Sequence, residues 1–168
     1  SQLSSGQRSP AVYWWYARSF GLLDFAALTD NDQWGDRVLD AAAFARAAEV
    51  TQEFDLPGVF LPILAFQWSP PKQGHRIVLF SERPASLPTF ASGVDSPAKL
   101  RAAIPSGSLL LVPNPSGSTN DSATDPALAG SGREDLVEIY SSLGCFERAG
   151  THRAATRETA GAFVTDLL

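Results

Sequence analysis

The sequence predicts an α/β fold with a largely parallel sheet. Two observations support this: short, almost continuous apolar runs alternate with longer amphipathic segments, and Gly, Pro, Asn or Asp residues separate them. Strands that are apolar at nearly every position are typical of parallel sheets covered on both faces, and alternating strand and helix patterns are typical of βαβ units. A chain of 168 residues is long enough for a hydrophobic core. We therefore expect a single domain over residues 1–168.

The first third of the chain predicts a helix, a strand and a second helix. Proline suits the first turn of a helix and glycine its end, so a helix is expected from Pro10 to Phe20, before Gly21. Residues 22–29 are an apolar run that stops at Asp30-Asn31-Asp32, which predicts a strand buried on both faces. Residues 36–54 place apolar side chains at helical spacing and form the clearest helix.

The middle of the chain predicts three more strands and a short helix. Residues 59–68 are mostly apolar, although Pro62 within them indicates an edge, a bulge or a late start. A turn separates them from a strand at residues 75–80, which suggests a local hairpin. Residues 96–104 begin with Ser-Pro, which is typical of a capped helix, and residues 108–113 predict a fourth strand.

The last third predicts a long loop, a strand and a closing helix. Residues 114–132 are rich in Pro, Ser, Gly, Asn and Asp and predict a mobile loop over the strand ends. Residues 136–140 predict a fifth strand, and residues 154–168 a final helix. Because α/β folds carry their chemistry at the carboxyl ends of strands, a site is expected at these ends. The candidate segments are residues 30–32, 67–69, 113–116 and 140–142.

Composition and charge exclude several functions. The net charge is -5 and only two of the thirteen basic residues are lysines, so no basic cluster indicates a nucleic-acid partner. Cys145 is the only cysteine, which excludes an intramolecular disulfide and a four-cysteine zinc site. No apolar run reaches the length that crosses a bilayer, and the first residues do not resemble a signal peptide. We expect a soluble protein, cytoplasmic by default, with a small-molecule or protein partner.

Motifs for nucleophilic catalysis and nucleotide binding are absent from the sequence. Residues 141–145 lack the Gly-x-Ser-x-Gly elbow of an α/β-hydrolase, and Cys145 has no recognisable histidine and carboxylate partners. Residues 130–132 do not make a phosphate-binding glycine loop. His152 lies in a polar segment typical of a solvated loop.

Five segments resemble, in the same order, motifs of the PHP (polymerase and histidinol phosphatase) family. Asn31 follows Thr-Asp where that family has a metal-binding histidine, and Gln67 precedes Trp-Ser where it has a bridging glutamate. His75 is retained in a Gly-His-Arg strand, whereas Asn114 precedes proline where another ligand histidine is usual. A late strand containing Glu138 resembles the fifth segment.

This resemblance implies a partial or distorted TIM-like barrel, the seven-stranded PHP type. The family's first His-x-His pair would lie upstream of residue 1 and its last Asp-x-His motif is missing, so a PHP-like domain without these two motifs is expected. With amides at ligand positions, the resemblance implies a degenerate, catalytically inactive domain acting as a binding or scaffolding module without a cofactor. The alternative is an active phosphoesterase-like hydrolase using divalent Zn, Mn or Fe, completed by residues outside this chain. A third possibility is a piece of a larger protein whose flanking strands complete the sheet.

The resemblance implies a pocket formed by the former ligand positions: Asp30, Asn31, Gln67, His75, Asn114 and Glu138. Carboxamides supply neither negative charge nor a good nitrogen donor, and they can satisfy one another by hydrogen bonds where a metal once held the site together. No metal is expected, and His75 and Asp30 remain the candidate ligands. His75 is otherwise a hydrogen-bonded residue at the sheet end. Asp30 and Asp32 either pair for acid/base work or cap the loop and the next helix.

Overall fold

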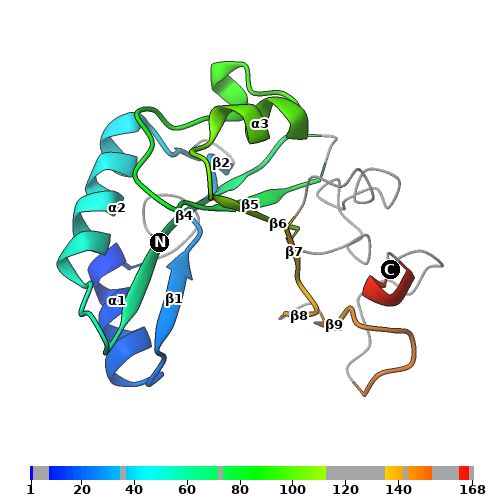
Figure 1. Ribbon diagram of the computed structural model, residues 1–168, viewed down its shortest axis with the longest axis horizontal. Helices are drawn as coiled ribbons and strands as arrows, with labels where there is room; N and C mark the ends of the chain where they lie inside the picture. The colour runs from blue at the N-terminus through cyan, green and yellow to red at the C-terminus, as the bar shows by residue number, and fades with distance from the viewer. Residues whose placement is uncertain are drawn as a thin grey trace.

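A computed structural model describes residues 1, 8–34, 37–71, 74–112, 135–141, 144–152 and 163–166. Within these residues, helices pack against one curled five-stranded sheet, with two small hairpins beside it (Figure 1). No helix among them is long and apolar enough to cross a membrane.

The five-stranded sheet has the order β1-β4-β5-β6-β7. The strands are β1 (Phe25–Leu28), β4 (Leu61–Trp68), β5 (Arg76–Leu79), β6 (Leu109–Val112) and β7 (Leu136–Val137). β1 pairs with β4, and β6 with β7, in parallel; β4 with β5, and β5 with β6, are antiparallel. β5 therefore runs against the other four strands, and both described edges of the sheet are parallel pairs.

This topology corrects the predicted fold class. The protein is α/β, but its sheet is a mixed half-barrel rather than a seven-stranded, largely parallel TIM-like barrel. The antiparallel pair of β4 and β5 agrees with the expected local hairpin, since their connection is too short for the crossover that joins parallel neighbours. The error arose at β6, which also pairs with β5 antiparallel, because an apolar run has the same composition whichever way its strand runs.

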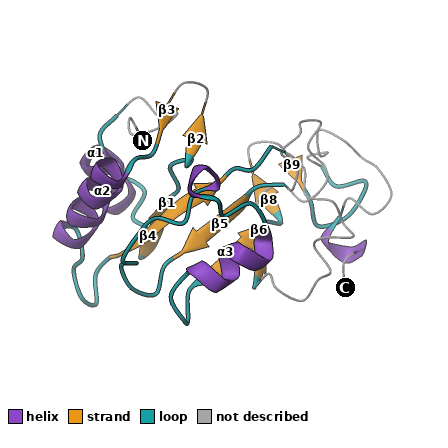
Figure 2. Cartoon of the chain, turned by 90° about the horizontal axis from the view of Figure 1, so that it is seen from above, coloured by secondary structure: helices purple, strands orange, loops and turns teal. Residues whose placement is uncertain are grey.

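The helices lie at one end and over one face of the sheet (Figure 2). They are α1 (Pro10–Ser19), α2 (Ala41–Glu53) and α3 (Pro97–Ala103), with single 3-10 turns η1 (Phe90–Ser92) and η2 (Val164–Asp166). Two hairpins complete the described elements: β2 (Gln33–Trp34) with β3 (Arg37–Val38), and β8 (Tyr140–Ser141) with β9 (Gly144–Cys145).

Local signals explain where the helices begin and end. α1 begins at Pro10 and stops before Gly21, where a Cβ atom would lie 2.9 Å from the Ala17 carbonyl oxygen. The Ser96 side chain accepts a hydrogen bond from the Lys99 N–H and caps α3. These two helices confirm the sequence prediction. α2 begins five residues later than predicted, because Asp40 is its N-cap and accepts the Ala43 N–H at 2.7 Å.

The main core lies between the sheet and the helices α2 and α3. Its fully buried members on β4 and β5 are Phe66, Trp68 and Val78, and they pack with side chains from both helices and from β6. Phe80 links the sheet to α2. Its ring stacks on Phe66 of β4 and meets Phe44 of α2 edge-on, each with ring centroids 5.7 Å apart. A second core joins α1 to the sheet through Trp14, Val50 and Phe60.

The opposite face of the sheet is only partly covered. Phe25, Leu61 and Leu109, which point away from the helices, are 64%, 55% and 39% exposed. β1 alternates between exposed and half-buried positions. The prediction that residues 22–29 form a strand buried on both faces was therefore wrong, because the second face of β1 is open and the strand begins only at Phe25.

Pro62 lies where β4 has no neighbour on its β5 side. The N–H groups of Leu61 and Gln67 bond to Asp24 and Asp30, which flank β1. The Leu64 carbonyl instead accepts from Phe80 on the β5 side. Alternation along the strand turns Pro62 to the β5 side, three residues before the β5 register begins at Ala65. Proline has no N–H to donate, so a local strand edge suits it. Of the edge, bulge or late start that Pro62 indicated, the structure shows a local edge within a strand that lies between two others.

The C-terminal third departs from its prediction where it is described. The expected strand over residues 136–140 is divided into β7 and β8, with Glu138 and Ile139 between them. Of the expected helix over residues 154–168, the structure describes only the four residues 163–166, which include the turn η2. The expected loop over residues 114–132 lies outside the described residues.

Candidate functional site

The carboxyl ends of β1 and β4 meet in a buried polar cluster, made of Asp30, Asn31, Asp32, Gln67, Ser69 and His75. The Gln67 N–H donates to the Asp30 carbonyl at 2.9 Å, and the Asp32 N–H donates to the Gln67 carbonyl at 2.8 Å. Asn31 and Gln67 are thereby opposite each other in a parallel bridge. The structure thus brings two of the four candidate segments, residues 30–32 and 67–69, together at one end of the sheet.

The amide side chains of this polar cluster bond to its other members. The Gln67 Nε2 atom lies 2.7 Å from His75 Nδ1, and the Asn31 Nδ2 atom donates to Ser69 Oγ at 3.3 Å. Gln33, which follows Asp32 in the sequence, donates from Nε2 to the Ser69 carbonyl at 2.6 Å. An amide nitrogen can only donate, so His75 Nδ1 is the acceptor of its hydrogen bond.

Asp32 joins three segments of the chain. Its carboxylate accepts the Ser69 N–H and the Phe90 N–H, each at 2.9 Å, and is 2% exposed. Burial raises the pKa of Asp32, while the hydrogen bonds from the backbone of Phe90 and Ser69 oppose that rise. The side chain holds the end of β4 to the start of η1. The expectation that it caps the next helix was wrong, because Asp40 does so.

Asp30 is paired with the first residue of the chain. The Ser1 amino group forms an ion pair with this carboxylate, and the Ser1 hydroxyl donates to its other oxygen at 2.7 Å. Asp30 is 3% exposed. Its carboxylate oxygens therefore bind Ser1, and its contacts differ from those of Asp32.

His75 is half-buried at the start of β5, where the neighbouring residue Arg76 is fully buried. Burial lowers the pKa of His75, and the positive charge of Arg76 lowers it further. A proton on Nδ1 would also face the donating amide nitrogen of Gln67. The folded protein therefore favours the neutral imidazole.

The stability of the protein is expected to fall in mild acid because of His75. The unfolded chain takes up this proton near pH 6.5, whereas the folded chain resists it until a lower pH, so the contribution is complete above 6.5 and is lost below it. Urea unfolding from pH 7.5 to 5 should show this loss in wild type and a smaller one in His75→Gln. His152→Gln controls for removing an exposed imidazole. Equal slopes in wild type and His75→Gln would contradict the assignment.

The remaining predicted site residues are not part of the polar cluster as described. Glu138 follows β7, at the same end of the sheet as the polar cluster, but β5 and β6 separate β7 from β4. Asn114 lies outside the described residues. Within the described part of the chain, no three His, Cys, Asp or Glu side chains converge as they would around a metal ion.

Sequence reasoning missed the roles of Ser69 and Phe90. Ser69 contacts Asn31, Asp32 and Gln33 through three different groups, and its position just after a predicted strand was the available signal. The Phe90 N–H is 58 residues from its acceptor Asp32, and no local pattern reports such a contact.

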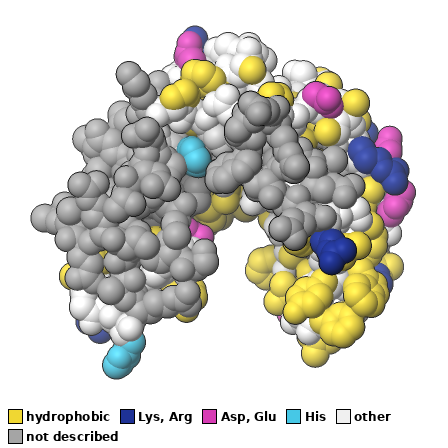
Figure 3. All heavy atoms as spheres, turned by 180° about the vertical axis from the view of Figure 1, so that it is seen from behind, with side chains coloured by type: hydrophobic (Ala, Val, Ile, Leu, Met, Phe, Trp, Pro, Cys, Tyr) yellow, Lys and Arg dark blue, Asp and Glu magenta, His cyan; other side chains and the backbone are white. Residues whose placement is uncertain are grey.

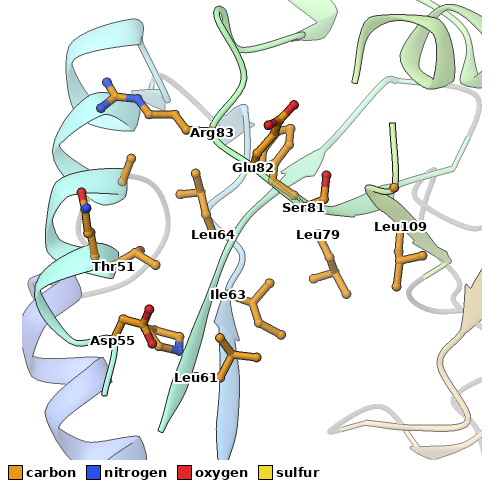
Figure 4. Close-up of a pocket in the computed structure, with 15 residues that line it drawn as sticks. Thr51, Asp55, Leu61, Ile63, Leu64, Leu79, Ser81, Glu82, Arg83 and Leu109 are labelled. Atoms are coloured by element: carbon orange, nitrogen blue, oxygen red, sulfur yellow. The ribbon is translucent and has the colours of Figure 1, made fainter. Parts of the chain in front are cut away.

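A groove opens at the other end of β4, between α2 and the start of β6. It has a volume of about 640 Å³. Figure 4 shows Leu61 and Ile63 of β4 on the same side as Leu79 and Leu109, and Asp55, which follows α2, on the other side of β4. Glu82 and Arg83, which follow β5, are exposed and contribute charge to its lining. The groove thus combines an apolar floor with charged groups at its margin.

The polar cluster and the groove are at opposite ends of the same strand, one formed of mutually bonded polar groups and the other open. Their chemistry can be argued only from these contacts, since no protein-family model, curated protein or solved structure matches the chain.

Proposed function

We propose that this chain is a catalytically silent binding module in which the polar cluster is a metal-free structural element. One observation carries the proposal: the amide nitrogen of Gln67 lies 2.7 Å from His75 Nδ1, so in the neutral imidazole Nδ1 accepts a hydrogen bond and Nε2 carries the proton, and neither nitrogen offers a lone pair to a metal. The amide nitrogen of Asn31 also donates, to Ser69 Oγ. Amides thus hold together the positions where the PHP-like resemblance expects metal ligands.

Asp32 supports the same interpretation. Its carboxylate accepts the backbone N–H groups of Ser69 and Phe90, so both of its oxygens are engaged within the protein. Their hydrogen bonds hold the strand ends and η1 together.

A binding role is supported by the groove at the far end of β4. Its floor of Leu61, Ile63, Leu79 and Leu109 would bury apolar groups, and Glu82 and Arg83 could orient a polar end of a ligand. Strand β4 separates it from the polar cluster, so a ligand there would not require the amide network. We propose a small molecule or a short peptide with an apolar portion as the ligand class.

Metal content tests the proposal. Wild-type protein is expected to purify without stoichiometric metal and to bind zinc weakly, because three or more anionic or imidazole ligands do not converge in its described residues. The double substitution Asn31→His with Gln67→Glu should tighten zinc binding by about tenfold or more, since it adds an imidazole and a carboxylate beside His75. Elemental analysis and zinc titration calorimetry measure both.

Gln33→Glu is the matched control, because it adds a carboxylate at the margin of the polar cluster without creating a ligand beside His75. It should leave zinc affinity near that of wild type. Stoichiometric zinc, manganese or iron in wild type, with metal-dependent phosphoesterase activity, would overturn the proposal in favour of an active hydrolase.

A further inference from the structure

Helix α1 is apolar on every side, although only one of its sides is covered. The inner side buries Pro10 and Trp14, and Trp14 packs against Val50 of α2 and Phe60. Arg18 is its only charged residue. A helix without a polar side is normally buried all round in a folded protein. Within the part of the chain that the structure describes, no layer covers the outer side of α1.

The outer side of α1 and the turn after it form one apolar surface, which we name the aromatic face. Its members are Val12, Tyr13, Trp15, Tyr16, Phe20, Leu22 and Leu23, with exposed fractions from 37% for Tyr13 to 80% for Leu22. Hydrophobic side chains gather at the lower right of Figure 3, at the end of the molecule that carries α1. Leu22, the most exposed member, has a left-handed backbone conformation with φ of 49°.

The rings of the aromatic face are already ordered by contacts with one another. Phe20 meets Trp15 edge-on with ring centroids 4.8 Å apart, and stacks on Tyr16 at 5.6 Å. Arg18 is turned away from this group, since its guanidinium lies 5.5 Å from the ring of Phe54. Ordered side chains lose little further entropy on association, so the aromatic face is prepared to bind.

The area of the aromatic face matches that of a stable dimer. The exposed fractions of its seven side chains correspond to roughly 700 Å² of apolar surface, against about 800 Å² per partner in a standard interface. The largest apolar patch on an ordinary monomer is about 300–600 Å². Its aromatic composition is also typical of interface centres.

We propose that two copies of this chain associate through their aromatic faces, with α1 packed against α1 of the second copy about a two-fold axis. Copies of net charge -5 repel each other, so they associate best through a surface without acidic side chains, and the aromatic face has none. A two-fold interface needs only a self-complementary surface, which stacked and edge-on rings provide. This inference does not depend on the polar cluster or on its metal content.

Sedimentation velocity of the full chain over a range of concentrations tests the dimer. Wild type should change from monomer to dimer as concentration rises. Tyr16→Glu and Tyr16→Lys should each raise the dimer dissociation constant by about a hundredfold, because each places like charges opposite one another at the two-fold axis. An equimolar mixture of the two variants should restore the dimer as a heterodimer, since glutamate then faces lysine.

Ile139→Glu is the matched control, since Ile139 is 55% exposed but lies between β7 and β8, at the opposite edge of the sheet from β1 and α1. It should dimerise like wild type, and circular dichroism should show that all three variants are folded. The inference is overturned if wild type stays monomeric over a hundredfold rise in concentration, or if the mixture of the two Tyr16 variants stays monomeric. It is also overturned if the wild-type monomer binds phosphatidylcholine vesicles instead of a second copy.

Discussion

Phe66→Ala is expected to lower the free energy of unfolding by about 3–5 kcal/mol, which is a large part of the stability of a domain this size. Phe66 is fully buried at the centre of β4 and its ring stacks on Phe80. Phe80 in turn contacts Phe44, so removing the first ring leaves a cavity beside the contact between the sheet and α2. Urea denaturation monitored by circular dichroism measures the loss.

Phe25→Ala provides the same chemical change on an open surface. Phe25 is 64% exposed on β1, so we expect a loss below about 1 kcal/mol. If Phe66→Ala is too unstable to fold, Phe66→Leu should give an intermediate, measurable loss. Equal effects of alanine at positions 66 and 25 would show that the core does not lie between the sheet and α2.

Asp32→Ala is expected to lower the free energy of unfolding by about 3 kcal/mol, because it leaves two buried N–H groups, those of Ser69 and Phe90, without their acceptor. Asp40→Ala is the matched control: it removes an exposed carboxylate that accepts one N–H at the start of α2, and should cost about 1 kcal/mol. Chemical denaturation of both variants at pH 7 provides the comparison.

The dependence on pH separates the charge of Asp32 from its hydrogen bonds. Burial raises its pKa, so the folded state prefers the protonated acid, and this contribution to stability decreases as pH rises above the unfolded value of 3.8. Asp32→Asn stays neutral and should lack that decrease. If Asp32→Ala has the same free energy of unfolding as wild type, Asp32 does not hold β4 to η1.

Local chemistry was enough to predict α1, α3 and the β4–β5 hairpin. A proline at the first turn of α1, a serine cap before α3 and a turn between two apolar runs each act within a few residues. The start of α2 was misplaced because residues 36–40 continue an apolar helical spacing, although Asp40 interrupts it. Strand direction and the open second face depend on contacts between distant segments.

The same distinction applies to the candidate site. Asp30 and Asn31 follow β1 and Gln67 lies at the end of β4, and the ends of a parallel pair are where distant residues come close, so the sequence could indicate them as one site. The hydrogen bond from Gln67 to His75 depends on β5 running back beside β4 in the register that the hairpin turn sets, and the sequence pattern indicated the hairpin without its register. The contact between Asp32 and Phe90 depends on how an intervening loop folds.

Pro62 hinders other chains from adding a strand to the segment of β4 that has no neighbour on its β5 side. Fibrillar assemblies grow when an incoming strand finds a regular row of backbone donors and acceptors at an unpaired edge. At the segment of β4 beyond the end of β5, this row is interrupted, because Pro62 presents a carbonyl oxygen and no N–H. The groove beside it is therefore open to ligand side chains while resisting cross-β growth.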